Sequence, residues 1–136
     1  MDSVKDRVFL SPETFARLGD LVAGSDWEQV RTICSAIADA DDAPAEAFYL
    51  LAIDAHHRED YASLLTFAQA AMDRDPMCAE YADLLAVAYA LLGDLRNSLF
   101  CAKLATAATS NSQLRGWLPA DLPNLRDAFA KAEEAP

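Results

Sequence analysis

Apolar residues recur along this chain at helical spacing, in blocks that short polar segments separate. One block contains Phe48, Leu51, Ala52 and Ala55. After the polar segment HREDY, a second block contains Leu64, Leu65, Ala68, Ala71 and Met72 and stops at Pro76. Spacings of three and four residues place apolar side chains on one face of an α-helix, and a proline ends such a pattern. The pattern predicts a helix, a tight turn and an antiparallel helix.

The same pattern occurs a second time further along the chain. Sliding the chain so that residue 45 falls on residue 79 aligns residues 45–76 with residues 79–110 without a gap. Identical residues then coincide, as in Leu51 with Leu85 and Asp60 with Asp94. A fixed period of about 34 residues is typical of helical repeat proteins. We therefore predict two successive helix hairpins, one in residues 45–78 and one in residues 79–112.

A more divergent hairpin is predicted before these two, in residues 11–44. Asp26 and Trp27 again place an acidic residue before an aromatic one, one period ahead of Asp60 and Tyr61. Ser11 is a favoured N-cap, and Pro12 suits the first position of a helix.

A further helix is predicted in residues 120–134, after the repeats. Asp121 is its expected N-cap, and apolar residues recur behind it on one face. A helix there would cap the open end of a stack of hairpins. A mobile arm, or a linker into another domain, is the alternative.

The two aligned units resemble the tetratricopeptide repeat family. The family signature combines an aromatic residue, leucine followed by a small residue, a Gly-Asp-aromatic turn, small residues on the second helix and a closing proline. The matching residues of the first unit are Phe48, Leu51, Ala52, Asp60, Tyr61, Ala71 and Pro76. Those of the second are Leu85, Ala86, Tyr89, Gly93, Asp94 and Ala105. The units depart from the signature at Glu59, which replaces the turn glycine, and at Ala82 and Ser110. The resemblance implies an all-α fold, a right-handed superhelical stack of antiparallel helix hairpins forming one domain over residues 1–136.

The charge of the chain narrows the class of partner. Twenty-two acidic and 11 basic residues give a net charge of -11, without a cluster of lysine or arginine. Such a surface repels nucleic acid and anionic membranes and favours a basic or amphipathic protein segment. No window approaches the roughly 18 apolar residues of a membrane span. The three cysteines form no CxxC pair, which disfavours a disulfide framework or a zinc site and favours a cytoplasmic location.

Both histidines of the chain lie beside carboxylates in the segment AIDAHHREDY, residues 52–61. Neighbouring residues of a helix point about 100° apart, so His56 and His57 do not readily share one metal ion. We favour a helix end with Asp60 capping the next helix over a metal or acid-base site. Because the sequence also has no GxSxG motif and no phosphate-binding glycine loop, we expect no enzymatic activity, no metal and no cofactor.

By resemblance, fixed positions on the first helix of each unit line a concave groove. They are Glu46, Tyr49, Leu50, Ile53, His56 and His57 in the first aligned unit, and Glu80, Asp83, Leu84, Val87, Ala90 and Leu91 in the second. An apolar floor with acidic edges suits an amphipathic or hydrophobic segment that carries basic residues. In the alternative, these side chains pack against one another or against the C-terminal helix.

The predicted function is that of a non-catalytic adaptor, which binds a protein segment in this groove. One alternative is a small acidic chaperone, similar to those of bacterial secretion systems, that holds an export client. Another is the N-terminal scaffold module of a larger protein or a self-associating unit, because an uncapped apolar end can stack on its neighbour.

Overall fold

The chain folds into helices, as the sequence predicts. The computed structural model describes residues 10–118, so the capping helix expected in residues 120–134 lies outside the described part. Within residues 10–118 there are seven helices and no β-strand. The helices are α1 (Pro12–Ala23), α2 (Trp27–Ala38), α3 (Ala45–His57), α4 (Tyr61–Arg74), α5 (Ala79–Leu91), α6 (Leu95–Ala107) and α7 (Ser112–Arg115).

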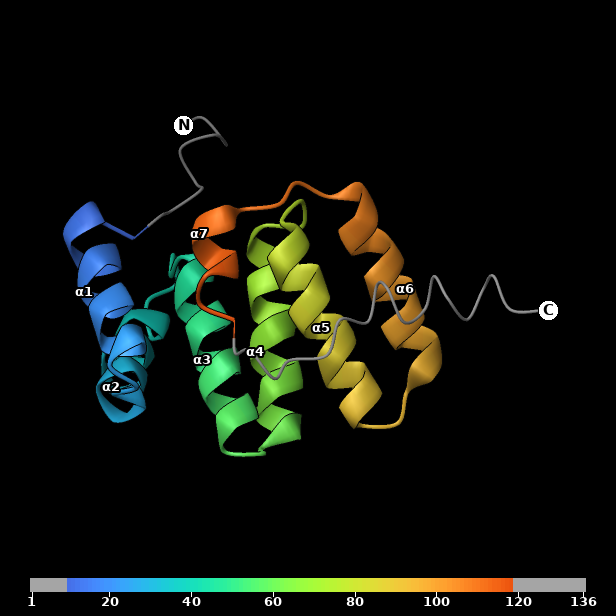
Figure 1. Ribbon diagram of the computed structural model, residues 1–136, viewed down its shortest axis with the longest axis horizontal. Helices are drawn as coiled ribbons and strands as arrows, with labels where there is room; N and C mark the ends of the chain where they lie inside the picture. The colour runs from blue at the N-terminus through green and yellow to red at the C-terminus, as the bar shows by residue number, and fades with distance from the viewer. Residues whose placement is uncertain (1–9, 119–136) are drawn as a thin grey trace.

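The first six helices form three hairpins that follow one another in chain order (Figure 1). Within each hairpin the two helices pack together, and α2 packs on α3 as α4 packs on α5. Tyr49 of α3 and Tyr81 of α5 also meet, with ring centroids 5.2 Å apart. The second helices of the hairpins begin at Trp27, Tyr61 and Leu95, which lie at equal intervals along the chain. The period of the sequence is therefore also the period of the helices.

The turn inside each hairpin has the same geometry three times. Each second helix begins at an aspartate whose side chain accepts a hydrogen bond from the backbone N–H three residues later, at 3.2–3.3 Å. These N-caps are Asp26, Asp60 and Asp94. The residue before each N-cap has a positive φ, 59° at Ser25, 57° at Glu59 and 85° at Gly93. A left-handed conformation costs a non-glycine residue about 1–2 kcal/mol, so Glu59 lowers stability there without changing the turn.

The first helices α3 and α5 are covered on almost every side. All residues of α3 from Ala45 to Ala55 are buried, whereas α4 buries only Leu64, Ala68 and Ala71. A helix with apolar residues all round its axis belongs inside a protein rather than on its surface. Something other than the hairpin partner must therefore cover the remaining side of α3.

A buried carboxylate joins the first hairpin to the second. Asp54 of α3 is fully buried and accepts hydrogen bonds from Arg31 Nε of α2 and from Arg58 Nε, both at 2.9 Å. The two arginine side chains remain 42% exposed, so water solvates their outer edges. The charge of Asp54 raises the pKa of the Arg31 guanidinium, chiefly through the hydrogen bond.

Replacing Asp54 by asparagine is expected to lower the free energy of unfolding by about 1–2 kcal/mol, because the amide is neutral and its NH2 group must face an arginine donor in place of one carboxylate oxygen. Because the side chains of Arg31 and Arg58 are partly exposed, we expect a value near the lower end of this range. Urea denaturation followed by circular dichroism measures the change. Asp42→Asn, in the exposed loop before α3, is the matched control. Equal stability of the two variants would show that the ionic contact does not hold the hairpins together.

Candidate functional site

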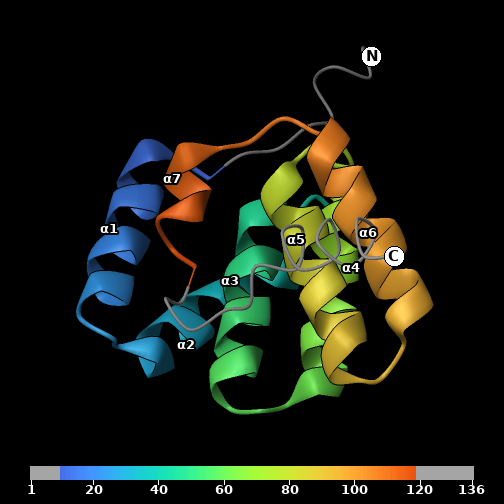
Figure 2. The same cartoon turned by 45° about the vertical axis from the view of Figure 1, so that its right-hand side comes forward.

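After α6 the chain turns back across the row of hairpins, and residues 108–118 form what we call the return segment (Figures 1 and 2). Its start is joined to the connection between α4 and α5. Thr109 N–H donates to the carbonyl of Met77, and Ala79 N–H donates to the carbonyl of Thr109, both at 2.9 Å. The segment then reaches α7, which lies beside α1 and α3 in both views. It thus crosses the hairpins in the direction opposite to the chain order.

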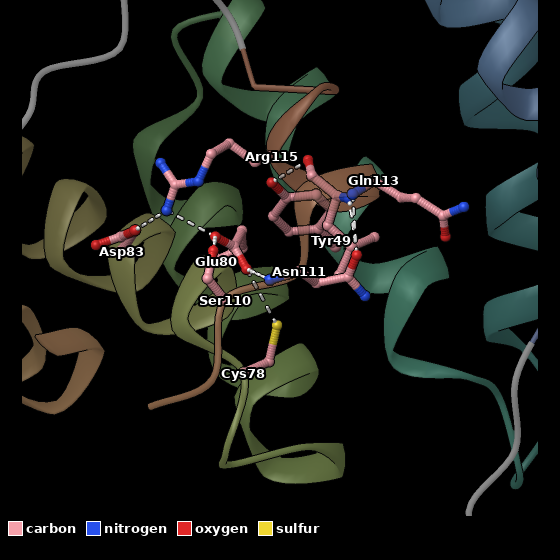
Figure 3. Close-up of polar contacts among 9 residues, drawn as sticks. Tyr49, Cys78, Glu80, Asp83, Ser110, Asn111, Gln113 and Arg115 are labelled. Atoms are coloured by element: carbon pink, nitrogen blue, oxygen red, sulfur yellow. Dashed lines mark hydrogen bonds and ion pairs between the residues drawn. The ribbon is translucent and has the colours of Figure 1, made fainter. Parts of the chain in front are cut away.

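Glu80, in the first turn of α5, is the polar centre of this contact (Figure 3). Its side chain is fully buried, and its Oε1 accepts the backbone N–H of Asn111 at 2.6 Å. Its Oε2 accepts the Ser110 hydroxyl at 2.9 Å and the Arg115 guanidinium at 2.7 Å. The Cys78 thiol lies 3.8 Å from Oε1. A buried carboxylate is stable only when such donors surround it, and here most of them come from the return segment.

The backbone of α7 is held at both of its ends. Asn111 Oδ1 accepts the N–H groups of Gln113 and Leu114, at 3.0 and 3.3 Å, and so begins the helical turn. The Tyr49 hydroxyl of α3 donates to the carbonyl of Leu114 at 2.9 Å. Burial, and after it the charge of Glu80, raises the pKa of Tyr49. The hydroxyl therefore stays protonated and keeps its proton for the Leu114 carbonyl.

Two apolar side chains anchor the return segment. Leu114 is 2% exposed and Trp117 is 8% exposed. The Trp117 ring stacks on Phe15 of α1, with centroids 4.5 Å apart and planes inclined by 28°. With Tyr49 on α3 and Glu80 on α5, the return segment touches the first helix of all three hairpins. We call the surface formed by α1, α3 and α5 the first-helix face.

Most residues that the sequence assigns to the groove are buried in this structure. The buried ones are Glu46, Tyr49, Leu50, Ile53, Glu80, Leu84 and Val87, with Ala90 and His56 half-buried. Asp83 is half-buried beside Arg115 at 3.5 Å, and His57 and Leu91 are exposed at the far ends of their helices. Tyr49, Glu80 and Asp83 are brought together by the return segment. A ligand can reach the buried members only if part of the chain moves.

Sequence reasoning missed the residues of the return segment itself. Asn111, Arg115 and Trp117 lie where the second aligned unit ends, and Ser110 stands in place of the closing proline. The signal for α7 was present, because asparagine is a favoured N-cap and Asn111 precedes a short run of helix formers. Nothing local in the sequence indicates which surface that turn would meet.

A cleft of about 480 Å³ opens beside the return segment. Leu10, Pro12, Phe15 and Ala16 line one side, and Glu46, Asp75, Tyr81, Asn111, Gln113 and Leu114 line the others. Burial, and after it the charge of Glu46, raises the pKa of Tyr81, so its phenol is neutral. The lining combines carboxylates with apolar side chains, which is the same combination that the return segment meets at Glu80 and Phe15.

The segment with both histidines is a hairpin turn, as predicted. His56 and His57 end α3, Arg58 is its C-cap, and the two imidazole centroids are 6.1 Å apart. The hydroxyl of Ser63, and then its backbone N–H, lower the pKa of the capping Asp60. Within residues 10–118, no three His, Cys, Asp or Glu side chains are grouped so that they could hold a metal ion.

The three cysteines are all free and buried. Burial raises the pKa of the Cys34 thiol to about 12 and that of the Cys101 thiol to about 11. Burial also raises the pKa of Cys78. Because a thiolate is the reactive form, these thiols are poor nucleophiles at neutral pH.

Comparison of the chain with protein-family models, with curated proteins and with solved structures gives no match. In the part of the chain that the structure describes, no helix combines the length and the apolar character needed to cross a bilayer.

Proposed function

We propose that the protein is a non-catalytic interaction module that binds a segment of another protein on its first-helix face. Its fold, in this proposal, is a right-handed superhelical stack similar to that of tetratricopeptide repeat proteins. The period of the sequence supports this fold, as does the recurrence of the same capped turn at Asp26, Asp60 and Asp94. Stacked helix hairpins expose extended faces that commonly bind proteins.

The observation that carries the proposal is the way in which the first-helix face holds the return segment. Glu80 accepts one backbone N–H, one hydroxyl and one guanidinium, and Tyr49 donates to one backbone carbonyl. Phe15 stacks on an aromatic ring. Main-chain hydrogen bonds with a few side-chain sites are the usual means by which proteins bind peptides. The surface that does this for a segment of the same chain is chemically suited to a segment of another.

The charge of the chain supports the kind of partner. A net charge of -11, with Glu80 and Asp83 side by side on α5, favours a segment that carries arginine or lysine. Electrostatic complementarity of this kind raises the association rate and selects the partner. We propose that the protein has no catalytic group and no cofactor, and that it binds neither nucleic acid nor a membrane. The proposal also includes a cytoplasmic location, which the free thiols of Cys34, Cys78 and Cys101 support.

A self-associating scaffold module is the second candidate, because the last hairpin exposes apolar side chains. Leu92 is 46% exposed, Leu95 62% and Phe100 60%, whereas large apolar residues of the earlier hairpins are mostly covered. An apolar end of a stack can pack on an equivalent surface of a second copy.

Site-specific photocrosslinking in cells tests the two candidates together. A benzophenone amino acid at Ala90, a half-buried position of α5 on the first-helix face, is expected to form an adduct with one partner protein. The same amino acid at Thr66, on the exposed side of α4, is expected to form none and serves as the control. At Phe100, an adduct between two copies would support the scaffold module. The same adducts from positions 90 and 66, or none from position 90, would contradict partner binding on the first-helix face.

A further inference from the structure

We propose that the partner carries the binding pattern of the return segment, which is leucine followed by arginine, any residue and an aromatic residue, and that it binds by displacing that segment. This inference rests on the proposed function. It specifies which partner binds that site and how access to the site is regulated. In the free protein, residues 108–118 then act as an internal ligand.

Arginine is selected by two carboxylates. Arg115 lies 2.7 Å from Glu80 Oε2 and 3.5 Å from Asp83 Oδ2. The Glu80 side chain is fully buried and that of Asp83 is 16% exposed, so water has little access to either carboxylate. A cation that bridges them supplies the hydrogen-bond donors that water does not. Both contacts are made by one nitrogen of the guanidinium, Nη2. A guanidinium is more weakly hydrated than an ammonium group, so it suits an ion pair with a buried carboxylate better. We therefore expect arginine rather than lysine at this position of the partner.

Leucine and the aromatic residue are selected by the apolar part of the first-helix face. Leu114 and Trp117 are three residues apart, and the Trp117 N–H donates to the Leu114 carbonyl at 3.0 Å. This tight turn after α7 brings the two residues to the same side. Leu114 is almost fully buried, and Trp117 stacks on Phe15 at 4.5 Å. Aromatic pairs in this arrangement contribute more than their buried area alone, by about 0.5–1.5 kcal/mol.

The residue between the arginine and the aromatic ring is not specified. Gly116 has φ of -63°, an ordinary value for any residue. A Cβ added there would lie 3.4 Å from the Gln113 carbonyl oxygen, which is normal van der Waals contact. A glycine is therefore not required, and the pattern that a partner must match has a free third position.

Displacement is physically feasible because the return segment forms little stable structure without the first-helix face. Its helix α7 spans four residues, and a helix of that length is not stable in water by itself. The segment is thus ordered by the first-helix face. When it leaves, the carboxylate of Glu80 and the hydroxyl of Tyr49 are free for a partner with the same donors and acceptors. A tethered ligand acts at an effective concentration of about 1 mM, so it weakens the apparent affinity for any free competitor.

A labelled peptide with the sequence of residues 108–118, ATSNSQLRGWL, is the probe. Fluorescence anisotropy measures its binding to the full chain and to three variants. Arg115→Glu repels the return segment from Glu80 and Asp83, and Trp117→Ala removes its stack on Phe15. We expect both to bind the peptide at least tenfold more tightly than the unaltered chain, because the tethered competitor is weakened. Arg96→Glu, an equal charge change on the exposed side of α6, should leave the affinity unchanged.

A second peptide, with glutamate in place of its arginine, should lose at least tenfold in affinity for every variant. Equal binding of the two peptides would overturn the role of the arginine. If Arg115→Glu and Trp117→Ala fold by circular dichroism but bind no more tightly than the unaltered chain, displacement is wrong. If neither variant folds, the return segment is a permanent part of the core, and displacement is equally wrong.

The proposed function and this inference can fail separately. A partner crosslinked at position 90 whose contact segment lacks the Leu-Arg-x-aromatic pattern would keep the proposed function and overturn the inference. If the peptide binds to Arg115→Glu but no partner is crosslinked at position 90, the return segment can be displaced, but its natural competitor is not another protein.

Discussion

Leu50→Ala is expected to lower the free energy of unfolding by about 2–5 kcal/mol, because it removes apolar contacts and leaves a cavity in a packed core. Leu50 is fully buried in α3, although its position in the repeat assigned it to the floor of a groove. Leu84, the corresponding residue of α5, is buried to the same degree. Leu84→Ala should therefore show a loss of the same size. Chemical denaturation by urea, followed by helical circular dichroism, measures both.

The matched control is Leu95→Ala. Leu95 is 62% exposed at the start of α6, so the same truncation there should change stability little. The comparison also separates the two interpretations of Leu50. If Leu50→Ala unfolds at the same urea concentration as the unaltered chain but loses its partner, Leu50 lines an open groove. A large loss of stability instead places it in the core that supports the first-helix face.

Glu80→Gln is expected to lower the free energy of unfolding by about 2–3 kcal/mol, since an amide presents a donor to groups that are themselves donors. Whichever oxygen becomes NH2, it faces either Asn111 N–H or the Ser110 hydroxyl and Arg115. Removing one partner of a fully buried ion pair costs about 3–5 kcal/mol, but Arg115 is 44% exposed and water compensates in part. The expected loss is therefore smaller than that range.

Release of the return segment should be visible apart from stability. Trypsin cleaves after arginine, and the bond after Arg115 is protected while the segment lies on the first-helix face. Glu80→Gln should accelerate cleavage at this bond more than at other sites. Glu28→Gln, in the first turn of α2 and exposed, is the control, since it removes the same favourable charge from a helix N-terminus without breaking a buried contact. Equal cleavage rates in the two variants would show that Glu80 does not hold the segment.

The hairpins were predictable because their signals are local. Asp60 caps a helix by bonding to the N–H of Ser63, three residues away, and needs no other part of the chain. Ser11 and Pro12 likewise start α1 from within one turn. Because the turn is built by Asp26, Asp60 and Asp94 at equal intervals, sliding the sequence against itself was enough to find it. The all-α fold follows from these elements.

The sequence also indicated the burial of α3. Residues 45–55 are apolar on every side of the helix, with Glu46 and Asp54 as exceptions. A helix of this kind is covered all round. The resemblance to the repeat family instead placed Leu50 and Ile53 on the floor of a groove, and both are fully buried.

By itself the sequence determined the helices of the three hairpins, their capped turns and the period at which they recur, because each of these helices and turns depends on residues within a few positions of one another. Only the tertiary structure decided where the return segment lies. Glu80 and Arg115 are 35 residues apart in the chain, and Tyr49 and Leu114 are 65 apart. Neither pair shares a period or a motif. Such contacts arise when buried polar groups and apolar side chains from distant segments find complementary partners, which no local pattern specifies.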